Sequence, residues 1–96
     1  MENRLIKKSI DASVEAKTKE LTEVLEHAAD DMNSLLITLW HEMSTQHPWD
    51  AAMTLQVLAE AAARHAVTAR AHQAQLTTLK CMQEVVDSES TEEERR

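Results

Sequence analysis

Apolar residues recur every three or four positions along two long stretches of the sequence, one on each side of residues 44–50. In the first stretch, one row with a spacing of seven consists of Val14, Leu21, Ala28 and Leu35, and a second consists of Thr18, Leu25, Met32 and Leu39. This 4-3 alternation is typical of helices in coiled coils and bundles. Ala29, Leu36 and Met43 flank the two rows and widen the stripe. We expect a bundle face that is wide enough to touch two neighbouring helices.

The second stretch keeps a strict 3-4 spacing from residue 55 to residue 86. Its row consists of Leu55, Leu58, Ala62, His65, Ala69, His72, Leu76, Leu79, Gln83 and Val86. Many residues beside this row are alanine, and small side chains let helix axes approach to about 8 Å. The pattern predicts a second helix that packs closely against a neighbour.

The chain has no glycine, and its one proline, Pro48, lies between the two stretches. Proline fixes its own φ and lacks an N–H group, so it suits the first turn of a helix, and it disfavours the α conformation at His47. Asp50 follows in the first turn, where a carboxylate meets the positive end of the helix dipole. We therefore predict an all-α domain over residues 1–86, a hairpin of two long antiparallel helices at about 4–44 and 48–86 with a corner at 44–50.

One point within the first stretch leaves an alternative open. Asp31 or Ser34 could cap a new helix, because short polar side chains compete for backbone hydrogen bonds, although the apolar phase runs through this region without a slip. Residues 87–96 contain no apolar side chain and predict a disordered acidic tail.

Composition and charge narrow the classes of function. The chain has a formal charge of −7, and residues 21–50 contain no lysine or arginine. Direct nucleic-acid binding is not expected, because phosphate contacts depend on clustered cations. The acidic surface either keeps the protein soluble or imitates a nucleic acid toward a basic partner. Glycine-rich phosphate loops and nucleophile motifs are absent, so we expect no enzymatic activity and no cofactor.

Cysteine usage and hydropathy indicate a cytoplasmic protein that does not enter a membrane. Cys81 is the only cysteine, which excludes an intrachain disulfide. The sequence near Met1 shows no apolar stretch of signal-peptide length. The densest apolar run, residues 35–40, is much shorter than a transmembrane helix.

His65 and His72 lie two turns apart in the apolar row of the second stretch. This spacing is too long for one straight helix to chelate a metal ion with both side chains, so a metal site would need a ligand from elsewhere, such as His27. Histidines that hydrogen-bond across the seam between the helices are the favoured interpretation, and protonation there would make association sensitive to pH. The third alternative is that the phase is offset and both are exposed.

A lone hairpin of this kind exposes one side of its seam, which favours assembly into a four-helix bundle as a homodimer, or docking onto a protein partner of unknown identity. The expected architecture resembles small helical-hairpin dimers such as the plasmid RNA-binding repressors of primer type and helical quorum-sensing antiactivators, a likeness of shape that transfers no residue roles. Trp40 and Trp49 flank the corner and either pack together or anchor a partner. The residues expected at interfaces are Leu25, Met32, Leu35, Leu36, Leu39, Trp40, Met43, Trp49, Leu55, Leu58, His65, His72 and Leu76.

The leading hypothesis is therefore a small non-enzymatic interaction module, acting as an adaptor, a chaperone or an antagonist of a partner protein. The alternative is an acidic inhibitor that blocks a nucleic-acid-binding surface, such as a factor encoded by a phage or mobile element. A third class is a sensor of metal or pH that uses His65 and His72.

Overall fold

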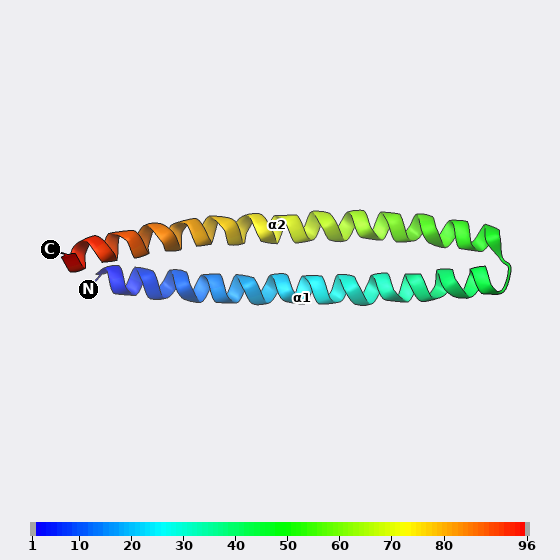
Figure 1. Cartoon of the computed structure of the whole chain (residues 1–96), viewed down its shortest axis with the longest axis horizontal. Coiled ribbons are helices and arrows are strands. Elements are labelled where there is room, and N and C mark those ends of the chain that lie inside the picture. The colour runs from blue at the N-terminus through cyan, green and yellow to red at the C-terminus, as the bar shows by residue number, and fades with distance from the viewer. Residues whose placement is uncertain (1, 96) are drawn as a thin grey trace. The chain divides into compact units, whose positions relative to one another are not determined.

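The chain folds into two helices joined by a short corner. The structure, a computed structural model, describes residues 2–95, with side chains for residues 4–89. Helix α1 spans Glu2–Ser44 and helix α2 spans Pro48–Arg95 (Figure 1). The predicted all-α helical hairpin is confirmed. Helix α1 continues through Asp31 and Ser34, so the break considered at these residues does not occur.

Helix α2 runs beyond Val86, the residue at which the predicted hairpin ends. The sequence predicts a disordered tail over residues 87–96. The glutamates and arginines of this segment are good helix formers. Lys7 Nζ also lies 3.2 Å from Asp87 Oδ1, which links this part of α2 to α1. The helix reaches Arg95, while the side chains beyond Glu89 and the whole of residue 96 lie outside the described residues.

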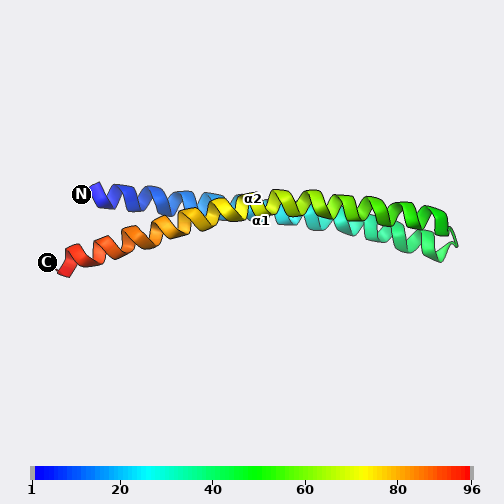
Figure 2. The same ribbon diagram turned by 90° about the horizontal axis from the view of Figure 1, so that it is seen from above.

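The two helices contribute to two compact units. The corner unit comprises Thr22–Arg70, and the end unit comprises Met1–Leu21 and Ala71–Arg96. In the corner unit α1 and α2 lie side by side and run in opposite directions, as both views show (Figure 1, Figure 2).

The corner begins with a Schellman motif at the end of α1. The N–H of His47 donates to the carbonyl of Glu42 over 2.8 Å, and the N–H of Gln46 donates to the carbonyl of Met43 over 3.2 Å. Gln46 has a φ of 59°, the left-handed conformation that this motif requires and that glycine most often supplies. Pro48 then opens α2 at its first position, as predicted, because its missing N–H has no partner to lose there.

The seam of the corner unit keeps the first predicted row of α1 but is turned away from part of the second. Val24 and Asp31 are half-buried on it together with Ala28 and Leu35, whereas Leu25 is 51% exposed. In the end unit Lys17 is likewise half-buried and Thr18 is exposed. The second predicted row is therefore wrong at Thr18 and Leu25. The observed rotation of α1 lets Asp31 and other polar groups reach partners on α2.

Helix α2 keeps the predicted face toward α1, apart from Leu55. His65, Ala69, His72, Leu79, Gln83 and the other members of the row are half-buried or buried, whereas Leu55 is 54% exposed and Thr54 occupies the seam in its place. The Thr54 hydroxyl donates to Glu42 Oε1 over 2.6 Å, which accounts for this exchange.

Two polar pairs set the register of the corner unit. Asp31 lies opposite His65 and Glu42 lies opposite Thr54, and the two residue numbers of each pair add up to 96. A residue n of α1 is therefore level with residue 96 − n of α2. Polar pairs within an apolar seam favour one alignment, because any slip leaves polar groups without partners.

The hydrophobic core of the single chain is very small. Among the described residues only Ile10, Ala51, Ala61 and Leu76 are buried, and two of these four are alanine. Many larger apolar side chains, including Leu36, Trp40 and Met43, remain about half exposed or more. Because apolar burial is the main stabilising contribution to folding, the single chain leaves much of that contribution unused.

Candidate interaction face

Helix α1 carries a second apolar row beside the seam. Its members recur at a 4-3 spacing and are Leu25, Ala29, Met32, Leu36, Leu39 and Met43. Residues at this spacing lie on one face of an α-helix. Met32 and Leu39 are half-buried at the edge of the seam, whereas Leu25, Leu36 and Met43 are 49–56% exposed. We call this row the α1 stripe.

Helix α2 carries a matching row with the same 4-3 spacing, which we call the α2 stripe. Its members are Pro48, Ala52, Leu55, Ala59, Ala62 and Ala66. This row is made of small residues except at Leu55, whereas the α1 stripe is made mainly of leucine and methionine.

An open groove next to the corner joins the two stripes. It has a volume of about 590 Å³, and its walls combine residues of both stripes with two others: Leu39, Met43, Gln46, Pro48, Ala51, Ala52 and Leu55. The shared groove places the two stripes on the same side of the corner unit. We call this side the uncharged face, because no member of either stripe carries a charge.

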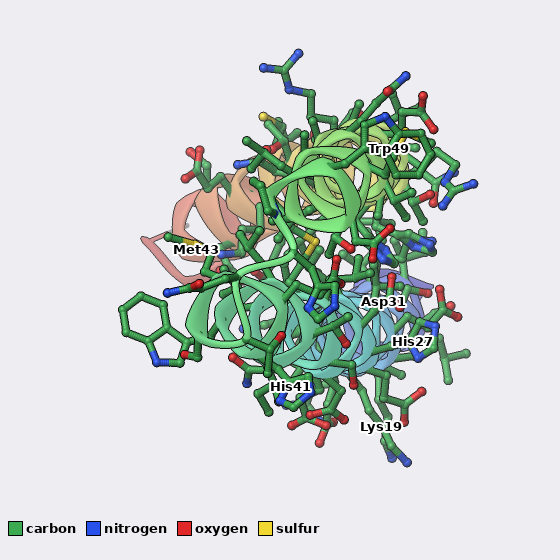
Figure 3. All side chains as sticks on the ribbon, turned by 90° about the vertical axis from the view of Figure 1, so that its right-hand side faces the viewer. Lys19, His27, Asp31, His41, Met43 and Trp49 are labelled. Atoms are coloured by element: carbon green, nitrogen blue, oxygen red, sulfur yellow. The ribbon has the colours of Figure 1, made fainter. Side chains whose placement is uncertain are left out.

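A cluster of polar side chains lies on the opposite side of the corner unit. In a view along the helices, Met43 projects to one side while His27 and Asp31 lie on the other (Figure 3). His65 Nε2 donates to Asp31 Oδ2 over 2.7 Å, and the rings of His27 and His65 meet edge to face with centroids 5.9 Å apart. The hydrogen bond from His65 holds the pKa of Asp31 below its usual value, against a smaller opposing effect of desolvation. The charges of His65, His27 and Arg64 lower this pKa further.

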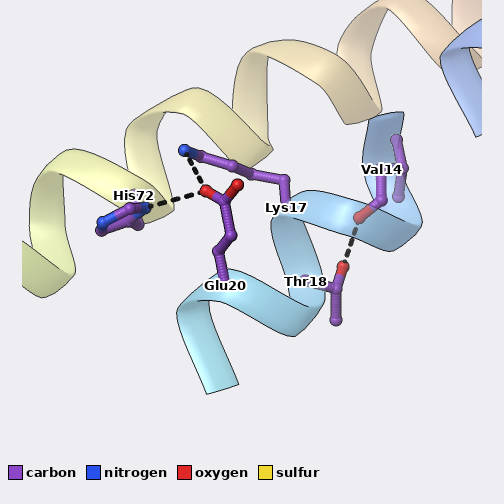
Figure 4. A network of polar contacts seen from close by, with 5 residues as sticks. All are labelled: Val14, Lys17, Thr18, Glu20 and His72. Atoms are coloured by element: carbon purple, nitrogen blue, oxygen red, sulfur yellow. Dashed lines mark hydrogen bonds and ion pairs between the residues drawn. The ribbon is translucent and has the colours of Figure 1, made fainter. Parts of the chain in front are cut away.

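A related cluster lies in the end unit around Glu20 (Figure 4). Lys17 Nζ donates to Glu20 Oε2 over 2.9 Å, and His72 Nδ1 lies 3.7 Å from the same oxygen, too far for a hydrogen bond. The hydrogen bond and the charge of Lys17 lower the pKa of Glu20, and the charge of His72 makes the smallest contribution. In the same view the Thr18 hydroxyl donates to the Val14 carbonyl over 2.7 Å, which ties Thr18 to its own helix.

His65 hydrogen-bonds across the seam to Asp31, whereas His72 makes only the longer contact with Glu20. Both are half-buried on the seam, and each faces a carboxylate of α1. Among the described residues no three histidine, cysteine, aspartate or glutamate side chains form a group that could hold a metal ion. Cys81 is exposed.

The residues expected at interfaces separate into three groups. Leu35, Leu58, His65, His72 and Leu76 lie in the seam between α1 and α2. The second group belongs to the uncharged face and consists of Leu25, Met32, Leu36, Leu39, Met43 and Leu55. The two tryptophans form the third group.

Trp40 and Trp49 are 71% and 73% exposed, so neither indole gains much burial from the other. Trp40 lies four residues after Leu36 and three before Met43, next to the α1 stripe. In Figure 3, Trp49 projects from α2 on the side away from Met43.

Ala52, Ala59 and Ala66 are not among the residues that the sequence predicts at interfaces. The signal that identifies them is their 4-3 spacing with Pro48, Leu55 and Ala62. Alanine adds little to a hydrophobicity pattern, so the row becomes visible only beside the bulky stripe on α1.

Comparison of the chain with protein-family models, with characterised proteins and with solved structures finds no match. Neither of the described helices has a segment that is both apolar enough and long enough to cross a lipid bilayer.

Proposed function

We propose that this protein is a non-enzymatic protein–protein interaction module that acts as a homodimer, with two hairpins joined through their uncharged faces into a four-helix bundle. The observation that carries the proposal is the uncharged face itself. It presents two parallel apolar rows on one side of a hairpin whose own core contains very few buried side chains. Exposed apolar surface of this extent marks an association site in soluble proteins.

The decisive experiment compares two aspartate variants on the same turn of α1. Leu36 belongs to the uncharged face, and we expect Leu36→Asp to weaken dimerisation by roughly 100-fold, because burying an unpaired carboxylate costs several kcal/mol. Ile37, one residue further along the helix, is 71% exposed and points away from the stripe, so Ile37→Asp serves as the matched control. Molar mass is measured by light scattering, with helicity followed by circular dichroism.

The wild type and Ile37→Asp should both show twice the 10.8 kDa mass of the single chain at concentrations where Leu36→Asp is monomeric. A Leu36→Asp protein that keeps both the dimer mass and its helicity would show that the face has been assigned wrongly. A monomeric wild type would overturn the dimer.

A homodimer of this kind leaves an apolar row of α2 uncovered, and we propose this row as the contact for the partner protein. Trp49, Met53 and Val57 recur every four residues and are 73%, 47% and 44% exposed. Tryptophan is enriched among residues that dominate binding energy. Trp49→Ala should therefore lower partner capture without changing the dimer mass, whereas Leu36→Asp should change the mass.

An acidic row supports the alternative function, an inhibitor that occupies the nucleic-acid site of a basic partner. Glu23, Glu26 and Asp30 follow a 3-4 spacing along α1 and are all exposed. Ionic strength distinguishes the two functions, because exposed charges are screened within about 8 Å at physiological salt, whereas apolar contacts are not weakened by salt. A partner captured from host lysate at low salt and lost at high salt would favour the inhibitor, and one retained at high salt would favour apolar docking.

A further inference from the structure

We infer that the second copy binds the uncharged face with its corner at the same end, so that the α1 stripe of each chain packs on the α2 stripe of its partner. This inference rests on the proposed homodimer and adds its geometry. Two hairpins that meet face to face about a twofold axis have two simple arrangements. In one, the axis runs along the helices, the corners share an end, and α1 lies on the partner's α2. In the other, the corners are at opposite ends, and α1 lies on the partner's α1.

The sizes of the side chains favour the arrangement with corners at one end. The α1 stripe is bulky and the α2 stripe is mostly alanine. When each bulky row packs on a small one, the two helix–helix contacts of the dimer have the same distance between axes. Large side chains then fill the space that small ones leave, as close packing of protein interiors requires. With corners at opposite ends, two bulky rows would hold the α1 helices apart while two alanine rows would need the α2 helices to approach closely.

The register of the corner unit adds a second argument. Because residue n of α1 is level with residue 96 − n of α2, Leu36 is level with residue 60, between Ala59 and Ala62. Met32 is level with residue 64, between Ala62 and Ala66, by the same rule. A twofold axis along the helices preserves these levels in the partner. Four bulky side chains of the α1 stripe, at positions 32, 36, 39 and 43, therefore meet gaps in the partner's α2 stripe, as knobs do in holes, whereas Leu25 is level with residue 71, beyond the end of that stripe.

Charge complementarity points the same way. Glu26 and Arg70 are exposed, and the register places them level with each other. Helical spacing puts both on the outer flanks of the hairpin, where α1 and α2 face away from each other. The flank of α1 adjoins the flank of the partner's α2 when the corners share an end, so Glu26 comes beside the partner copy of Arg70 at each rim of the interface.

The area is adequate for a stable dimer. The two stripes extend over residues 25–43 and 48–66, about 28 Å of each helix, and two packed helices are roughly 20 Å wide. The footprint is about 600 Å² per copy, or about 1,200 Å² in total, which meets the lower limit for specific interfaces.

Distances between spin labels decide the arrangement in the full-length chain. Single cysteines replace Glu23, Ser34 or Ser44, all exposed and outside both stripes, in a Cys81→Ser background. With corners at one end, all three positions give similar distances of about 25–30 Å between copies, since diagonal helices of a bundle have axes about 14 Å apart and each label projects outward from its own helix. With corners at opposite ends, Ser34 keeps a distance in this range, but position 23 moves to roughly 40 Å, because its two copies are then separated by about 33 Å along the helix axis.

A distance at position 23 that equals the one at position 34 supports the inference, and a distance at position 23 that is longer by about 10 Å or more overturns it while leaving the homodimer intact. If no intermolecular distance is found at any position and the mass is that of one chain, the proposed homodimer itself fails.

A charge reversal gives an independent check. Arg70→Glu should weaken the dimer by roughly 10-fold across its two rims, and adding Glu26→Arg should restore it. Loss without restoration contradicts the pairing of Glu26 with Arg70.

Discussion

At the scale of single residues, the corner depends on Gln46, the only described non-glycine residue with a positive φ. A side chain with a Cβ atom is disfavoured in the left-handed conformation by roughly 1 kcal/mol. The Schellman hydrogen bonds at Gln46 and His47 compensate for this cost. The corner is therefore closed by backbone hydrogen bonds rather than by the preference of its residues.

Replacing Gln46 by glycine should therefore stabilise the protein. We expect Gln46→Gly to raise the free energy of unfolding by about 0.5–1 kcal/mol, measured by urea denaturation at one fixed protein concentration. Thr45→Gly is the matched control, because Thr45 lacks a positive φ, its hydroxyl donates to the carbonyl of His41, and the same hydroxyl is hydrogen-bonded with Nδ1 of His47. A glycine at position 45 should destabilise, and equal effects at both positions would contradict the role of the left-handed conformation.

The Asp31–His65 pair predicts how stability depends on acid. The pKa of Asp31 is lower in the folded chain than its usual value of 3.8, so the folded state binds fewer protons than the unfolded state near that pH. The contribution of this carboxyl is present above about pH 3.8 and is lost as the pH falls through the lower folded pKa. Glu20 adds a change of the same sign.

Thermal midpoints measured between neutral pH and pH 2.5 test this sign. Asp31→Asn keeps an acceptor for His65 but removes the titrating carboxyl, so its midpoint should fall less steeply in acid than that of the wild type. An identical acid dependence in the two proteins would mean that the pair contributes nothing to it.

Because both seam histidines face carboxylates, we also expect the oligomeric mass to stay constant between pH 8 and 5.5, contrary to the pH sensitivity expected from the sequence.

At the scale of helices, α1 passes through Asn33 and Ser34 without a break. The apolar phase keeps this segment against α2, and tertiary packing overrides weak local propensity. Asn33 is exposed in the middle of this helix.

Asn33→Ala should raise the free energy of unfolding by about 0.5 kcal/mol, the difference in helix propensity between the two residues at an exposed interior position. Chemical denaturation with circular dichroism measures it. A neutral or destabilising effect would indicate that α1 is interrupted at this point, as the capping pattern at Asp31 and Ser34 allows.

At the scale of the whole molecule, the balance between buried and exposed apolar groups governs behaviour. Among the described side chains only four apolar residues are buried, which is a small core for a helical hairpin, and a homodimer would bury the uncharged face as well. Stability that depends on association rises with concentration, because the dimer is favoured by mass action.

The thermal midpoint of the wild type should accordingly rise by several degrees over about a hundredfold increase in protein concentration. Leu36→Asp should show a lower midpoint that does not change with concentration. A wild-type midpoint that stays constant across this range would argue for a protein that is stable as a single hairpin.

The sequence by itself determined where the helices lie and where the chain turns. Periodicity fixes the angular position of each residue on its own helix, and the single proline at position 48 with Asp50 behind it defines the start of α2. Local rules of this kind need no knowledge of distant residues. The same rules also located the apolar row of α2, including His65 and His72, on the face toward α1.

Only the tertiary structure decided which side of α1 faces α2. The row of Ala28 and Leu35 is common to the predicted and the observed seam, but the second row passes through Val24 and Asp31 in place of Leu25, which turns the centre of the face by about 50°. Periodicity alone does not resolve a rotation of this size. The choice depends on pairs far apart in sequence, such as Asp31 with His65. A buried polar group without a partner is costly, so these pairs turn α1 toward them and leave Leu25 and Leu36 on the uncharged face.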